Sequence, residues 1–163
     1  MCIRDSPGTD GLLVLSLVHT LLKRKKIDLE YLQSFTNAPF LVNISSSDTS
    51  KGLFLRDKSG NPLVVDHFSG ELKSFSDKGV KPSLTKCYSN KSGSFKTVFS
   101  LLTDKYMDES YSPKIVAPQC GLKEEQILGL AEEIAEIAFN KSIYIEQDWV
   151  DFRGEKRSGF VGR

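Results

Sequence analysis

The stretch 7–26 places the strongest constraint on what this chain can fold into. A polar turn, Pro-Gly-Thr-Asp-Gly, leads directly into residues 12–22, which are apolar at all but three positions. The three polar residues are Ser16, His19 and Thr20. This pattern predicts a helix that is buried on most of its circumference and is followed by four cations, where the helix dipole is negative. The fold must therefore provide apolar cover for this helix.

The turn before the helix allows two interpretations. Thr9 or Asp10 can cap the N–H groups that are left unpaired at a helix start, and Gly8 permits an unusual φ angle or a close backbone approach. A polar turn that leads into a buried helix is also where α/β proteins hold anionic cofactors. The pattern alone favours the plain cap, with a binding site as the alternative.

Charge and cysteine spacing exclude several kinds of site. The 163 residues carry a formal charge of +1, which gives no argument for a nucleic-acid partner or an anionic membrane surface. The cysteines are far apart and form no C-x-x-C pair, so the chain by itself predicts no zinc or iron–sulfur site. We interpret them as small buried hydrophobes. They are Cys2, Cys87 and Cys120.

Neither histidine predicts a catalytic site. His19 is expected to pack on the apolar helix with one ring nitrogen bonded to a carbonyl. His67 is expected to lie in a solvated turn. We therefore predict no catalytic residue and no metal ligand in this chain.

The first of three predicted parts, 7–42, is mainly helical. Asp28 is expected to cap a second helix, 29–35, and the two helices should form a hairpin. A short apolar strand, 40–42, completes this part.

The second predicted part, 43–94, holds short strands and turns. Strands 53–56 and 63–66 flank the turn 57–62, and a third strand, 71–75, completes a meander. The residues from Gly79 to Ser94 are expected to form a surface loop.

The third predicted part, 95–163, returns to helices. Helices are expected at 95–106, 112–121 and 123–139, followed by a return strand at 143–145. The last helix has a broad apolar stripe, and its glutamates are interpreted as a solvated face rather than as paired catalytic carboxylates. A helix followed by a strand is half of a doubly wound α/β unit.

Several blocks, in order, resemble the catalytic subunits of molybdopterin oxidoreductases of the dimethyl sulfoxide reductase family. The blocks are PGTDGLLVLSLVHTLLKRKKIDLEYLQSFTNAPFLV, GLFLRDKSGNPLVVD, GVKPSLTKCY, SPKIVAPQCGLKEEQILGLAEEIA and DWVDFRGEKRSGFVGR. The hairpin insertion and the W-V-D-F-R-G loop look most like those of subunits related to cytoplasmic sulfite dehydrogenases and to polysulfide or thiosulfate reductases. Relatives of formate dehydrogenase and nitrate reductase are the alternatives. Residues 1–6 match nothing in the family and are interpreted as a non-native leader, so that 7–163 would be an internal fragment.

The resemblance implies a fold and a cofactor. It implies an α/β fold, part of a Rossmann-like, doubly wound cofactor-binding region with a small β-hairpin insertion at 43–94. The implied cofactor is bis(molybdopterin guanine dinucleotide) molybdenum, with a 4Fe-4S cluster bound upstream of this segment. In the family, the turn corresponding to Gly8, Thr9 and Asp10 lies beside the guanine end of the cofactor. Asp10 would accept hydrogen bonds from the guanine edge.

The resemblance also implies a reaction, partners and a location. The whole enzyme would carry out two-electron chemistry on a small molecule, with a sulfur oxyanion as the expected substrate, while this segment alone would not be catalytic. The expected partners are a membrane anchor subunit, together with an iron–sulfur electron-transfer subunit. We expect a cytoplasmic location, with the periplasm left open because an export signal would lie upstream.

A stand-alone α+β interaction module without a cofactor is the alternative. The missing cluster cysteines and the glutamate-rich helix face fit such a module equally well. The order of the family blocks argues against it, as does the large apolar helix. Sequence upstream of Pro7 in the same DNA would decide between the two.

Overall fold

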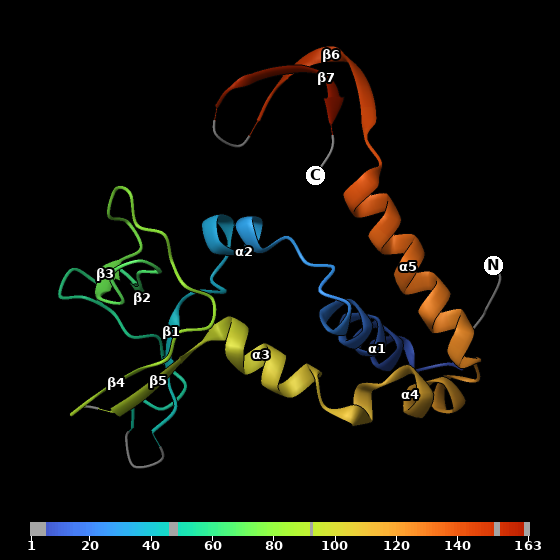
Figure 1. Ribbon diagram of the computed structural model, residues 1–163, viewed down its shortest axis with the longest axis horizontal. Helices are drawn as coiled ribbons and strands as arrows, with labels where there is room; N and C mark the ends of the chain where they lie inside the picture. Colours follow the sequence, from blue (N-terminus) through green and yellow to red (C-terminus); the bar gives the residue numbers. More distant parts are fainter. Residues whose placement is uncertain (1–5, 46–48, 92, 152–153, 162–163) are drawn as a thin grey trace. The chain divides into compact units, whose positions relative to one another are not determined.

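The computed structural model describes residues 6–45, 49–91, 93–151 and 154–161 (Figure 1), and excludes the side chains of the last two of these residues. The chain divides into two compact units. The helical unit comprises residues 1–26 and 108–163, and the sheet unit comprises residues 27–107. These units cut across the three predicted parts, because the first helix packs with helices from the end of the chain.

Three helices pack against one another in the helical unit (Figure 1). Its elements are α1 (Asp10–Lys23), the 3-10 turn η1 (Glu109–Tyr111), α4 (Pro113–Cys120), α5 (Glu124–Asn140), β6 (Ile143–Val150) and β7 (Lys156–Val161). The core consists of four buried side chains, Val116, Ala117, Cys120 and Ile127. Four leucines pack around them, namely Leu12, Leu13, Leu17 and Leu122.

Local sequence signals explain where α4 and α5 begin and end. Pro113 occupies the first turn of α4, where its missing N–H costs no helical hydrogen bond. Gly121 ends α4 in the left-handed conformation, with φ 69°, which a residue without Cβ adopts readily. At the start of α5, the Lys123 N–H donates to the Gln126 side-chain oxygen over 2.8 Å. These helices confirm the sequence prediction.

The orientation of α1 differs from the prediction. Its fully buried residues are the three polar ones, Ser16, His19 and Thr20, whereas Val14 is 55% exposed. The Thr20 hydroxyl donates to the Ser16 carbonyl over 2.9 Å, which satisfies one of the buried groups. A helix that is apolar nearly all round offers several similar faces. The neighbouring helices, not the helix's own periodicity, therefore decide which face is buried.

The predicted hairpin of the first two helices spans the boundary between the two units. Helix α2 (Leu29–Phe35) belongs to the sheet unit, while α1 belongs to the helical unit. The Asp28 side chain does cap α2 as predicted, accepting from the Tyr31 N–H over 3.0 Å. The cap of α2 could therefore be predicted from the sequence, but the elements that pack against α1 could not.

The described residues of the sheet unit form two small antiparallel sheets (Figure 1). Its strands are β1 (Leu41–Asn43), β2 (Leu63–Val65), β3 (Leu72–Ser74), β4 (Tyr88–Asn90) and β5 (Gly93–Thr97), followed by helix α3 (Val98–Tyr106). One sheet has the order β1-β5-β4, and β2 pairs with β3. Leu41, Val65 and Phe95 form the buried core of this unit.

The predicted turn between the first two strands of the meander is confirmed. The Asp57 carboxylate accepts from the Ser59 and Asn61 N–H groups over 2.8 and 2.9 Å. The predicted first strand, 53–56, is extended but joins its neighbours only through isolated bridges, including Arg56 with Pro62. Strands β2 and β3 confirm the other two predicted strands of the meander, 63–66 and 71–75.

The predicted loop at 79–94 is partly wrong. It contains the buried residues Ser83 and Leu84 and the whole of β4, which pairs with β5. Phe95 belongs to β5, so the helix predicted from that residue begins only at Val98. Pairing of β5 with both neighbours overrides the local helical pattern.

A Rossmann-like parallel sheet is not formed within the described residues, where every pair of strands is antiparallel. The predicted return strand exists but extends to Val150, and it pairs with β7 as a hairpin. The residues after Gly154 supply the pairing partner, which a helix–strand pattern cannot reveal. The fold shown is a mixed α/β arrangement with small antiparallel sheets.

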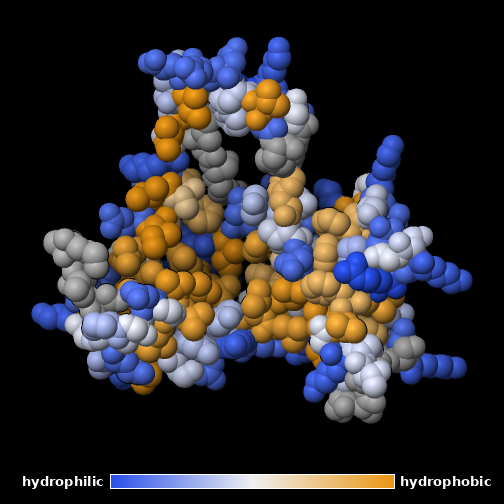
Figure 2. All heavy atoms as spheres, turned by 180° about the vertical axis from the view of Figure 1, so that it is seen from behind, coloured by the Kyte–Doolittle hydropathy of each residue, from blue (hydrophilic) through white to orange (hydrophobic). Residues whose placement is uncertain are grey.

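Both units leave large apolar side chains at the surface. The apolar stripe of α5 is buried at Ile127, Ala131 and Ala135, but Ile134 is 39% and Ile137 is 56% exposed. Figure 2 shows apolar residues reaching the surface on the face in view. No helix in the described part of the chain is long and apolar enough to cross a bilayer.

Candidate functional site

The turn at the start of α1 is held by hydrogen bonds to its own backbone. Gly8 adopts φ 81°, and no atom lies within 4 Å of where its Cβ would be. Thr9 occupies the cap position, but its hydroxyl donates backward to the Ser6 carbonyl over 2.6 Å and forms no cap bond. Asp10 is the first helical residue and not the cap. The sequence thus located the cap position, but the Thr9 hydroxyl stabilises the turn rather than the helix end.

The same turn is fixed to the end of α4. The Ser6 N–H donates to the Cys120 carbonyl over 2.8 Å, and the Cys120 thiol lies 3.9 Å from the Thr9 carbonyl. A Cβ at position 121 would lie only 2.9 Å from the Ser6 hydroxyl, so Gly121 permits this close approach. Residues about 110 positions apart therefore hold the turn in place.

A groove of about 390 Å³ opens beside the turn, between α1 and α5. Its apolar walls include Leu13, Leu122, Ile127 and Leu130. Its polar groups are Asp10, Glu125, Gln126 and Glu133. The combination of apolar walls and carboxylate oxygens suits a flat group that carries hydrogen-bond donors, and it disfavours an anion inside the groove.

Asp10 is the candidate residue that can reach a ligand most directly. Its side chain is exposed, and it has no hydrogen-bond or ion-pair partner among the described residues. As the first residue of α1, the carboxylate also lies at the positive end of the helix dipole. It can therefore accept paired N–H donors from a molecule in the groove.

Gly8 and Thr9 precede Asp10 in the turn, but they are not among the residues that line the groove. Gly8 is exposed, and its open surroundings leave the backbone accessible. The first N–H groups of α1 have no acceptor inside the helix, a property that favours negative charge near this end. The turn thus offers backbone donors, while the groove offers carboxylate acceptors.

The α5 side of the groove was not predicted from the sequence. Glu125 and Glu133 were interpreted as part of a solvated face, yet both line the groove together with Gly129. These three residues are spaced by four, so they share one helix face, and the central glycine leaves room beside α1. In the sequence, a glycine that lies four residues from a glutamate on either side could have indicated this face of the groove.

The other candidate residues behave as small structural groups. Cys120 and His19 are buried in the helical unit, as expected for both. Cys87 is exposed, contrary to the prediction of a buried hydrophobe, and Cys2 lies outside the described residues. His67 is exposed in a turn, as predicted. Within the described ranges, no cluster of histidine, cysteine or acidic residues could hold a metal ion.

The strongest electrostatic feature lies in the sheet unit, at the buried Asp66. Its carboxylate accepts from the Ser69 N–H, the Ser69 hydroxyl, the Lys73 ammonium and the Lys81 N–H, at 2.9–3.2 Å. These donors, led by Ser69, hold the pKa of Asp66 well below its usual range. Because these donors come from the turn, from β3 and from Lys81, the cluster stabilises the turn between β2 and β3.

Comparison with known proteins adds one distant relative. The chain is 29% identical, over 168 aligned residues, to a sulfite dehydrogenase subunit from Allochromatium vinosum. The alignment covers 96% of this chain but only 17% of that relative. The chain is thus a distant homologue of one segment of an oxidoreductase subunit. No family model matches the sequence.

Proposed function

We propose that this chain forms the segment of a molybdopterin-dependent oxidoreductase that binds the guanine dinucleotide end of a bis-molybdopterin cofactor. Similarity to the sulfite dehydrogenase subunit over nearly the whole chain carries the proposal. The accessible Asp10 carboxylate at a groove with apolar walls supports it, since a guanine edge presents two adjacent N–H donors. Gly8 and Thr9 would lie beside the same nucleotide.

The residues present fit the nucleotide end of such a cofactor. Leu13 and Leu130 can cover the faces of a planar base, and Asp10 can accept from its edge. The carboxylates of Glu125 and Glu133 would repel phosphates, so the phosphates would lie toward Gly8 and the first N–H groups of α1. With carboxylates inside the groove and N–H donors at the turn, the nucleotide would bind with its base in the groove and its phosphates toward Gly8.

Among the described residues, no group of three or more histidine, cysteine or acidic side chains could hold a metal ion. In the proposed enzyme, the molybdenum centre would supply two-electron oxidation or reduction of a small sulfur oxyanion. This chain's contribution would be to hold and orient the remote end of the cofactor. It would therefore determine cofactor retention rather than the chemical step.

The proposed reaction needs a route for electrons. A 4Fe-4S cluster elsewhere in the polypeptide belongs to the same proposal, and so do a membrane anchor subunit plus an iron–sulfur electron-transfer subunit. A Rossmann-like parallel sheet around the cofactor would likewise need strands in addition to the antiparallel pairs described above. Each of these expectations concerns the whole enzyme.

The direct test is Asp10→Asn in the complete polypeptide. The amide replaces one acceptor oxygen by an N–H group and removes the charge, so each of two charge-assisted hydrogen bonds should weaken by about 1.5–3 kcal/mol. Molybdenum and guanine nucleotide released per polypeptide should fall. The melting temperature of the cofactor-free protein should change little, because the lost charge–dipole interaction contributes only about 0.3–1 kcal/mol.

Glu30→Gln provides a matched control. Glu30 is an acidic residue in the first turn of α2 and is exposed, so its substitution removes a comparable charge from another helix start. Cofactor content in Glu30→Gln should equal that of the parent. Full cofactor retention in Asp10→Asn would show that the turn serves only to start the helix. The assignment of Gly8 and Thr9 would then be withdrawn too.

A further inference from the structure

Helix α5 is apolar over more of its circumference than the helical unit covers. Its buried residues end at Ala135, and Figure 1 shows the later turns extending away from α1 and α4. Leu130 and Ile134 are each 39% exposed, and Ile137 is 56% exposed. Spacings of three and four residues place these three side chains on one side of the helix, which we call the α5 outer face.

The α5 outer face is larger than the wall that it gives to the groove beside Asp10. Leu130 lines that groove, so the face begins at the groove and continues toward the end of the helix. Ile134 and Ile137 have no part in the proposed cofactor role. Single exposed apolar residues are common on protein surfaces, but three in line along one helix are typical of a surface that another element covers.

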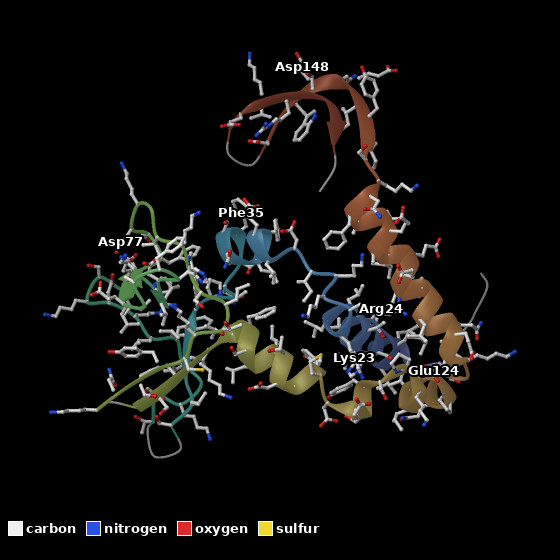
Figure 3. All side chains as sticks on the ribbon, viewed as in Figure 1. Lys23, Arg24, Phe35, Asp77, Glu124 and Asp148 are labelled. Carbon is white, nitrogen blue, oxygen red and sulfur yellow. The ribbon has the colours of Figure 1, made fainter. Side chains whose placement is uncertain are left out.

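The charged residues of α5 are all acidic, namely Glu124, Glu125, Glu132, Glu133 and Glu136. Arg24, labelled at the end of α1 in Figure 3, bonds to Glu132, and the Lys141 ammonium lies 3.8 Å from the Glu136 carboxylate. The other glutamates form no ion pair within the described ranges. The surface of α5 therefore keeps an excess of negative charge.

This charge indicates the chemistry of the element that covers the α5 outer face. Glu133 follows Leu130 by three residues and precedes Ile137 by four, so it borders the face directly. An apolar face with a carboxylate border is complementary to an amphipathic helix whose own polar border carries lysine or arginine. A second copy of the same face would set carboxylates against carboxylates, which electrostatic repulsion disfavours.

The extent of the aligned relative indicates where such a helix comes from. The alignment covers nearly all of this chain but only 17% of the sulfite dehydrogenase subunit, so most of that polypeptide lies outside the aligned segment. We propose that the α5 outer face docks a basic amphipathic helix supplied by another segment of the same, longer polypeptide. The proposal rests on the proposed function only in taking this chain as one segment of a longer subunit, and docking does not require the cofactor.

Photo-cross-linking of the complete, cofactor-free polypeptide tests the proposal. With a benzophenone amino acid in place of Ile137, mass spectrometry should identify a cross-linked peptide from outside residues 1–163 that carries lysine or arginine among apolar residues. The yield should not depend on protein concentration, because the contact lies within one polypeptide. The same photoreactive group in place of Lys58, in an exposed turn of the sheet unit, is the control and should not capture this peptide. Position 134 repeats the test if the variant at position 137 fails to fold.

A charge reversal tests the expected chemistry of the docked helix. Glu136→Lys should lower the cross-link yield at position 137 by about threefold or more, because it places a cation beside a basic segment. Glu71→Lys is the matched control, since it makes the same change at an exposed carboxylate of the sheet unit and should leave the yield unchanged.

The proposal is overturned if no peptide is captured, if the peptide comes from a second copy or from another protein, or if it lacks basic residues. Equal yields in Glu136→Lys and Glu71→Lys would also overturn it. Full cofactor retention in Asp10→Asn would remove the cofactor role but would leave the cross-link unchanged, so failure of one proposal can be told from failure of the other.

Discussion

The helical and sheet units are assembled from different parts of the sequence. The sheet unit is one continuous stretch, residues 27–107, and its carboxylate cluster at Asp66 uses donors within 15 positions along the chain. The helical unit joins the two ends of the chain. The hydrogen bonds that link α1 and its flanking residues to the later segments connect residues 86–114 positions apart.

This difference predicts unequal behaviour on unfolding. Contacts between residues close in sequence require little loop closure, so the sheet unit can form from its own stretch. The helical unit forms only when α1 meets α4 and α5. It also buries the Ser16 hydroxyl without a partner in the described part of the chain, whereas Asp66 in the sheet unit is fully satisfied. The helical unit is therefore expected to open first.

The largest expected effect comes from truncating each core separately. Ile127 and Leu41 are both fully buried, in the helical and the sheet unit respectively. Ile127→Ala and Leu41→Ala should each lower the free energy of unfolding by about 2–5 kcal/mol. Hydrogen exchange measured segment by segment should locate each loss in its own unit.

Leu53→Ala is the control for these truncations, because Leu53 is 62% exposed and should cost little. If either core variant accelerates exchange equally in both units, the units unfold together and the contrast between them fails.

An intermediate effect is expected from acid. The pKa of Asp66 is lowered in the folded state, so unfolding takes up a proton when the pH falls below the usual carboxyl range. The stability that Asp66 provides is present above about pH 4 and is lost as the pH falls further. Asp57, whose pKa is lowered chiefly by the Asn61 N–H, acts in the same direction. The protection factors of amides in the sheet unit, after correction for the intrinsic exchange rate at each pH, should therefore fall as the pH is lowered from about 5 to about 2.

Asp66→Asn should reduce this acid dependence and destabilise the sheet unit at neutral pH. Glu71→Gln removes a nearby exposed carboxylate and should leave the acid dependence unchanged. Denaturant titrations at several pH values provide the measurement. An identical pH dependence in the parent and in Asp66→Asn would contradict the role given to this cluster.

The smallest effect is expected at the ion pair between Lys23 and Glu109. The two side chains are 57% and 76% exposed, so Lys23→Gln should change the free energy of unfolding by less than about 1 kcal/mol. Any change should vanish at high salt, because exposed charges are screened. A larger, salt-independent loss in a denaturant titration would mean that this bond holds the helical unit together.

The sequence by itself determined the features that depend on neighbouring residues. Asp28 capping α2, Gly121 ending α4 and the Asp57 turn are all local hydrogen-bond or backbone effects, and they were predicted where they occur. The turn containing Gly8, Thr9 and Asp10 was likewise located, although its role as a nucleotide site stays a prediction.

Only the tertiary structure decided which elements meet. The α1 pattern could not show that its polar face would be buried, because that choice depends on helices about 100 positions away. Phe95 carries a helical pattern, yet it joins β5 because hydrogen bonds to β1 and β4 outweigh local preference. The groove beside Asp10 likewise needed α5 as its second wall. Partners distant in sequence leave no local periodicity, so their positions emerge only when the chain is folded.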